Sequence, residues 1–100
     1  MNHGRTDGNQ VSIVKTLLAF GASVQSLTSV GGGCPDLEVG WQGVNYLFEI
    51  KRDAKKKLLP SQIAWRNAWK GRVYRINNAF DALIIMGVGF DAAMRATGRK

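Results

Sequence analysis

Residues 31–51 read GGGCPDLEVGWQGVNYLFEIK, and they show the topology of this chain most clearly. Strands are favoured by β-branched and aromatic side chains, so residues 36–41 and 44–51 are predicted to be two strands. Gly40 and Gly43 flank a tight connection, which predicts that the two strands form a hairpin. The three glycines at 31–33 predict a turn before the first strand, because glycine adopts left-handed backbone angles without steric cost.

Two carboxylates and one ammonium group fall on this hairpin. Residues two apart on a strand share a face, so Glu49 and Lys51 should point the same way, with Ile50 toward the core. The hairpin places the strand of Asp36 beside the strand of Glu49, so the charged groups are expected to meet at one end. Charged side chains within the apolar residues 46–50 cost free energy unless they pair or bind an ion.

These groups suit metal-dependent chemistry on a phosphate. Mg²⁺ takes oxygen ligands and keeps several waters, so Asp36 and Glu49 are candidate ligands, with the carbonyl of Ile50 as an additional one. Mn²⁺ is expected to substitute. Lys51 would orient or deprotonate a metal-bound water, or neutralise charge on the phosphorus. Two simpler interpretations stay open: Asp36 as a turn residue after Pro35, and Glu49 with Lys51 as a salt bridge.

Local signals predict the elements on either side of the hairpin. Asn9 is expected to cap the first helix and Gly21 to end it. Pro60 suits the first turn of a second helix, and Asn78 can cap a third. The order αβββαβα predicts an α/β fold in which helices flank a mixed sheet. The expected helices cover residues 9–20, 60–70 and 79–86, and the remaining strands cover residues 22–27 and 72–76.

The length of 100 residues predicts a single domain. Residues 1–8 are interpreted as a flexible leader, 9–87 as the domain, and 88–100 as a C-terminal extension with a short helix and a frayed basic end. The single cysteine, Cys34, cannot form an internal disulfide. Because no segment is long enough to span a membrane and residues 1–5 lack an apolar signal core, an intracellular protein is expected.

The chain is strongly basic. It has 14 Lys and Arg against 7 Asp and Glu, which gives a net charge of +7. Such a field attracts polyanions, so nucleic acid is the expected partner, and no small-molecule cofactor is expected. A merely solvated surface is the alternative, and a membrane surface is disfavoured because no cationic amphipathic helix is present. The candidate phosphate contacts are Lys55, Lys56, Lys57, Arg66, Lys70 and Arg72.

The motifs in this sequence resemble a known nuclease superfamily. Pro35-Asp36 followed by Glu49-Ile50-Lys51 resembles the PD-(D/E)XK motif. Residues 7–14, the glycine turn and Pro60-Ser-Gln62 resemble the VRR-NUC branch, which includes small stand-alone proteins of phages and bacteria. The resemblance covers roughly residues 5 to 86. It implies a Mg²⁺-dependent endonuclease acting on DNA, in the cytoplasm of a bacterium or of a phage-infected cell.

The resemblance also implies roles for matching residues. Asp36 and Glu49 would hold metal, Lys51 would act on the water or the transition state, and Gln62 would lie close to the catalytic centre. A helix N-terminus at Gln62 could also direct backbone N–H groups at a phosphate.

One residue departs from the family pattern. Members of this branch commonly carry a Glu on the first helix, and Ser12 is aligned with it here. Serine lacks the charge of a carboxylate, so a metal site would be weakened unless Glu38, on the same strand face as Asp36, compensates. Two functions therefore stay open: a symmetric dimer that cuts four-way junctions or other branched DNA, and a nuclease-like domain that binds without cutting. Trp65 and Trp69 share a helix face and are expected to serve packing or a dimer contact.

Overall fold

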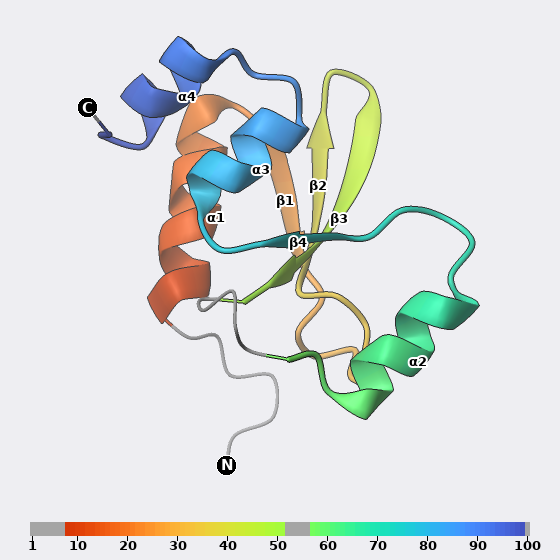
Figure 1. Cartoon of the computed structure of the whole chain (residues 1–100). Helices are drawn as coiled ribbons and strands as arrows, with labels where there is room; N and C mark the ends of the chain where they lie inside the picture. The colour runs from red at the N-terminus through yellow and green to blue at the C-terminus, as the bar shows by residue number, and fades with distance from the viewer. Residues whose placement is uncertain (1–7, 52–56, 100) are drawn as a thin grey trace.

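The computed structural model describes residues 8–51 and 57–99, and it shows one mixed sheet with helices around it (Figure 1). The strand order is β1-β2-β3-β4; β1, β2 and β3 are antiparallel neighbours, and β4 is parallel to β3. The strands are β1 (Ser23–Ser26), β2 (Leu37–Trp41), β3 (Val44–Ile50) and β4 (Tyr74–Ile76). The helices are α1 (Gly8–Phe20), α2 (Pro60–Ala68), α3 (Ala79–Ile85) and α4 (Phe90–Ala96).

The predicted fold class is confirmed, with the order αβββαβα followed by α4. The hairpin between β2 and β3 turns at Gln42 and Gly43, whose φ angles are +50° and +80°. Two successive residues with positive φ are what a two-residue type I′ turn requires. Gly21 ends α1 with a φ of +109°, as predicted. The second helix is shorter than predicted because the backbone is already extended at Trp69.

The predicted helix cap at Asn9 is wrong. Asn9 lies inside α1, and its side-chain Nδ2 donates to the carbonyl of Asn77 at 3.2 Å. The side chain therefore ties α1 to the segment between β4 and α3 instead of satisfying a backbone group of its own helix. Asn78 does cap α3, since its Oδ1 accepts from the backbone N of Asp81 at 2.9 Å.

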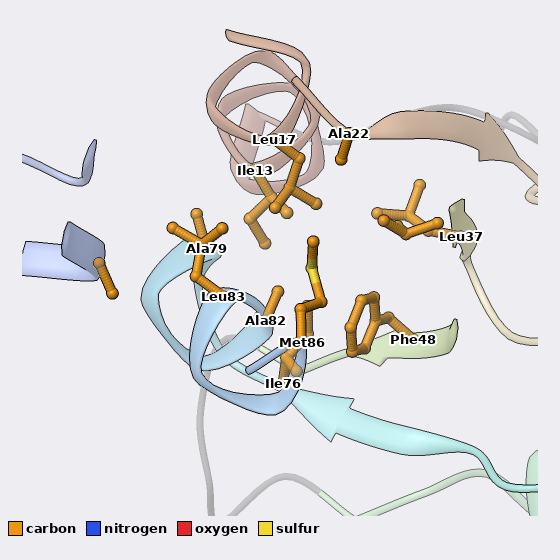
Figure 2. Close-up of a cluster of buried hydrophobic side chains, with 12 residues drawn as sticks. Ile13, Leu17, Ala22, Leu37, Phe48, Ile76, Ala79, Ala82, Leu83 and Met86 are labelled. Carbon is orange, nitrogen blue, oxygen red and sulfur yellow. The ribbon is translucent and has the colours of Figure 1, made fainter. Parts of the chain in front are cut away.

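The hydrophobic core lies between one face of the sheet and helices α1 and α3. Figure 2 shows Ile13 and Leu17 of α1 and Leu83 of α3 converging toward Leu37 and Phe48 of the sheet. Burial of such side chains contributes roughly 1.5–3 kcal/mol each, which makes this layer the main source of stability. Helical spacing groups Leu18 with Val14 and Leu17 in one apolar stripe of α1, but Leu18 is 53% exposed, so the stripe that meets the core is narrower than the spacing predicts.

Two further features extend this layer. Trp41, at the end of β2, packs against Phe20 with ring centroids 5.3 Å apart, so it covers the edge of the core. The C-terminal helix α4 adds Ala93, which is fully buried.

Helix α2 contributes nothing to this core. None of its residues is buried, and Figure 1 shows it lying apart from α1 and α3. The glycine turn approaches its first turn: a Cβ atom at Gly33 would collide with the carbonyl of Ser61. Close backbone approach is a reason for glycine at this position. None of the described helices is long and apolar enough to cross a membrane.

Candidate active site

Asp36 is clamped at the start of the hairpin, opposite Glu49. Its backbone N donates to the carbonyl of Phe48 at 3.0 Å, and its Oδ2 accepts from the backbone N of Ile50 at 2.8 Å. Leu37 pairs with Phe48 in the β2–β3 register, so the next positions outward are Asp36 and Glu49. Paired positions on adjacent strands point to the same side of a sheet, so both carboxylates leave the face opposite the core.

Glu49 is buried although it is charged in its ordinary state. Only 3% of it is exposed. Its Oε2 accepts a hydrogen bond from Gln62 Nε2 at 2.9 Å, and Lys51 Nζ lies 3.9 Å from the same oxygen. The structure thus brings together all four predicted catalytic residues, Asp36, Glu49, Lys51 and Gln62.

The ionisation of Glu49 is strongly perturbed by its burial and by the neighbouring Asp36. The pKa of Glu49 is raised to about 8, first by burial, then by the negative charge of Asp36 and by a hydrogen bond with it. The positive charges of Lys51 and Arg66 act in the opposite direction on this pKa. Two adjacent carboxylates resist simultaneous ionisation, so the metal-free pair tends to hold a proton.

Gln62 is oriented by both ends of its amide. Its Oε1 accepts from the backbone N of Leu59 at 2.8 Å, just before α2 begins. Because that bond fixes the oxygen end, the NH₂ end faces Glu49. The first turn of α2 is therefore bonded directly to a carboxylate on β3.

The donor atoms of this site fit a hard divalent cation. Two carboxylates at one place supply oxygen ligands of the kind that Mg²⁺ and Mn²⁺ accept, and their mutual repulsion is relieved by a cation. Within residues 8–51 and 57–99 no group of three or more His, Cys, Asp or Glu forms a metal site, so Glu38 does not join the pair. The nearby thiol of Cys34 is half-buried, and its pKa is raised by burial and then by the charges of Glu49 and Asp36.

Helix α1 directs Gln10, not Ser12, toward the sheet. Ser12 is exposed, whereas Gln10 is 5% exposed and its Nε2 donates to Ser26 Oγ at 3.4 Å. Ser26 pairs with Leu37, the residue after Asp36. Ser12, the residue aligned with the family Glu, therefore lies on the outer side of α1, and Gln10 occupies the inward position. The helical period contained the signal: Gln10 lies three residues before buried Ile13 and seven before buried Leu17.

The predicted nucleic-acid contacts separate into two groups. Lys57, Lys70 and Arg72 are exposed. Arg66 is half-buried and donates to the carbonyl of Val73 at 3.2 Å, and its charge acts on Glu49. Lys55 and Lys56 lie outside the described residues.

The two tryptophans of the α2 region contact each other. Trp65 and Trp69 stack with ring centroids 4.7 Å apart and an interplanar angle of 17°. Trp69 is 47% exposed, so this pair is not part of the core.

The sheet topology and the paired motif residues are those of a PD-(D/E)XK-like fold, in which the PD and E-x-K segments lie on adjacent strands. No family model matches this chain, and no curated protein matches it. A solved structure described as a VRR_NUC domain is similar, with a TM-score of 0.60 and 28% sequence identity over 76% of this chain and 89% of that chain. This similarity confirms the resemblance to VRR-NUC domains that the motifs indicated.

Proposed function

We propose that this chain is a metal-dependent endonuclease that hydrolyses DNA phosphodiester bonds. The main support for this proposal is the Asp36–Glu49 pair on the face of the sheet opposite the core. Lys51 and Gln62 both lie close to the carboxylate of Glu49. The similarity to a VRR_NUC domain supports a nuclease. The net charge of +7 supports a polyanionic substrate.

Each residue of the site has its own proposed role. Asp36 and Glu49 would hold Mg²⁺ or Mn²⁺, with the carbonyl of Ile50 as a further ligand. A bound cation supplies a Lewis acid and lowers the pKa of a coordinated water. Lys51 would hold that water or neutralise charge on the phosphate. Gln62 keeps the Oε2 atom of Glu49 in one position, which is how a neighbouring hydrogen bond orients a metal ligand.

The finer part of the proposal is selectivity for branched DNA, including four-way junctions, by a symmetric dimer. Two sites related by a two-fold axis can cut two strands of one branched substrate. Exposed apolar side chains at the two ends of α2 support a contact between two copies, since monomers rarely leave clustered apolar surface uncovered. Two such residues are Leu59 and Trp69.

A second candidate function is binding of nucleic acid without cleavage. The observation that favours it is Gln10, because a neutral amide occupies the inward position of α1. A site with two carboxylates holds a cation less tightly than a site with three, so binding could persist where hydrolysis is lost.

Cleavage of labelled four-way-junction and linear duplex DNA in Mg²⁺, Mn²⁺ and EDTA separates these functions. We expect metal-dependent cutting that Lys51→Ala abolishes and that Lys15→Ala, a matched exposed lysine on α1, retains. Paired symmetric cuts on the junction alone support the dimer. Equal cutting of both substrates contradicts junction selectivity, and tight binding without cutting in either metal supports the second candidate.

A further inference from the structure

An open depression of about 370 Å³ lies between β4, helix α2 and the segment just before that helix. Small-molecule sites occupy roughly 300–1,000 Å³, so this depression has room for one small ligand. Its lining combines two guanidinium groups, one amide and two aliphatic side chains. The lining residues are Leu58, Ile63, Arg66, Asn67 and Arg75.

The register of the sheet places this depression next to Glu49. Arg75 on β4 is the direct partner of Glu49 on β3. The preceding pair, Phe48 and Tyr74, faces the other side, where their rings lie 6.1 Å apart. Because successive side chains alternate between faces, Arg75 and Glu49 share the face that carries the site.

Arg66 reaches the same place from α2. It follows Gln62 by four residues, so both side chains leave the same side of the helix, and Gln62 contacts Glu49. Its Nη2 donates to the carbonyl of Val73 at 3.2 Å, which fixes the side chain. A guanidinium has five N–H donors, so one bond to a carbonyl leaves the planar fork able to bind a phosphate.

The lining suits a nucleotide. Guanidinium groups bind phosphate oxygens through charge-assisted hydrogen bonds. The aliphatic surfaces of Leu58 and Ile63 offer an apolar wall for a base, and the amide of Asn67 offers a donor and an acceptor for its edge. Ile63 is 46% exposed, so contact with a base would cover apolar surface that now faces water.

We propose that this depression, here named the Arg66–Arg75 pocket, binds the nucleotide next to the cleaved bond, with its phosphate on the two arginines and its base against Leu58 and Ile63. A base inside a pocket of this size must leave the duplex stack, which costs a few kcal/mol when the base is paired and least when it is not. The pocket therefore selects DNA that has an unpaired nucleotide beside the cut. This inference rests on the proposed function for the identity of the substrate.

Binding of thymidine 5′-monophosphate in EDTA, followed by amide chemical shifts, tests the pocket without cleavage. We expect shifts centred on Leu58, Ile63 and Asn67, and an affinity at least about tenfold weaker in Arg75→Gln, since hydrogen bonds to charged groups are strong. Arg95→Gln removes the same charge at an exposed position of α4, and this variant should bind the nucleotide like the parent protein. Ile63→Ala, at an exposed position, should weaken the binding of thymidine monophosphate and leave the binding of inorganic phosphate unchanged.

Two results would overturn the pocket. One is equal affinity for thymidine and its monophosphate, and the other is unchanged affinity for the monophosphate in both Arg75→Gln and Ile63→Ala. Cleavage assays separate this failure from failure of the proposed function. Equal cleavage of duplexes with and without an unpaired nucleotide would refute the selection for an unpaired nucleotide beside the cut. Nucleotide binding that is lost in Arg75→Gln would support the pocket even if the protein cleaves no DNA.

Discussion

Gln62 donates a hydrogen bond from its side-chain amide to Glu49 Oε2 at 2.9 Å, and this bond joins α2 to the sheet at the candidate catalytic centre. The helix buries no residue of its own, so apolar packing does not fix its position. The placement of α2 and the geometry of the site therefore depend on each other. Changes on either side of this bond should affect both.

Gln62→Ala tests that dependence. Loss of a hydrogen bond to a carboxylate should destabilise the protein by about 1–3 kcal/mol and lower the rate of metal-dependent cleavage. Amide hydrogen exchange should rise in residues 60–68 more than in α1, because the helix loses its bond to Glu49. Gln25→Ala, at an exposed position on β1, is the control and should change neither quantity. Unchanged exchange in α2 would show that other contacts hold the helix.

The carboxylate pair predicts how stability depends on pH in the metal-free protein. The pKa of Glu49 rises from 4.5 to about 8 on folding, so between these values the folded state holds a proton that the unfolded state releases. This contribution to stability is fully present below about pH 4.5 and is lost as the pH rises through about 8. Urea unfolding in EDTA from pH 5 to 9 measures it.

Asp36→Asn is the matched variant for that experiment. The amide keeps an oxygen that can accept from the backbone of Ile50 but removes the negative charge beside Glu49, so the pKa of Glu49 should fall. Stability should then decline less between pH 5 and 9 than in the parent. If the stability of the parent protein rises steadily from pH 5 to 9, that result contradicts the raised pKa of Glu49 beside Asp36.

The glycine turn gives a prediction about steric fit. Gly33 has a φ of +88° and no room for a Cβ atom against Ser61, whereas Gly32 has a φ of +66° and open space. Alanine in a left-handed conformation costs roughly 1–2 kcal/mol at either position. Gly33→Ala should lose stability and cleavage beyond that cost because α2 must move, while Gly32→Ala shows the conformational cost alone. Equal losses in the two variants, measured by unfolding and cleavage rates, contradict the close approach.

A carboxylate introduced on α1 tests which residue of this helix faces the candidate metal site. Gln10→Glu places a carboxylate near the end of β1 that lies beside Asp36, and it should tighten Mn²⁺ binding measured by calorimetry. Ser12→Glu adds the same charge at an exposed position and should leave Mn²⁺ affinity unchanged. The opposite ranking would restore Ser12 as the position that matches the family Glu.

The hairpin and its charged residues could be predicted because their signals are local. Turn glycines and strand alternation place Asp36, Glu49 and Lys51 at one end of two strands without knowledge of the rest of the chain. The errors at Asn9 and Leu18 have different physical causes. Asn9 is not the cap because the helix already includes Gly8. Leu18 is exposed because packing against α3 and β1 sets which side of α1 meets the sheet, and sequence spacing alone fixes that side only approximately.

The Arg66–Arg75 pocket lay beyond prediction for a related reason. Its lining comes from the segment before α2, from α2 itself and from β4, and only the parallel pairing of β3 with β4 brings Arg75 beside Glu49. Parallel strands pair through long crossovers, and the sequence does not show their register.

Glu49→Gln shows whether the carboxylate pair supports metal-dependent cleavage. This substitution keeps the shape of the side chain but removes its charge. Cleavage of branched DNA under single-turnover conditions in Mn²⁺ should fall to background in Glu49→Gln. Cleavage should persist in Glu38→Gln, the control, which changes a carboxylate of β2 two residues after Asp36. Equal cleavage by Glu49→Gln and the parent protein would contradict the assignment of this site.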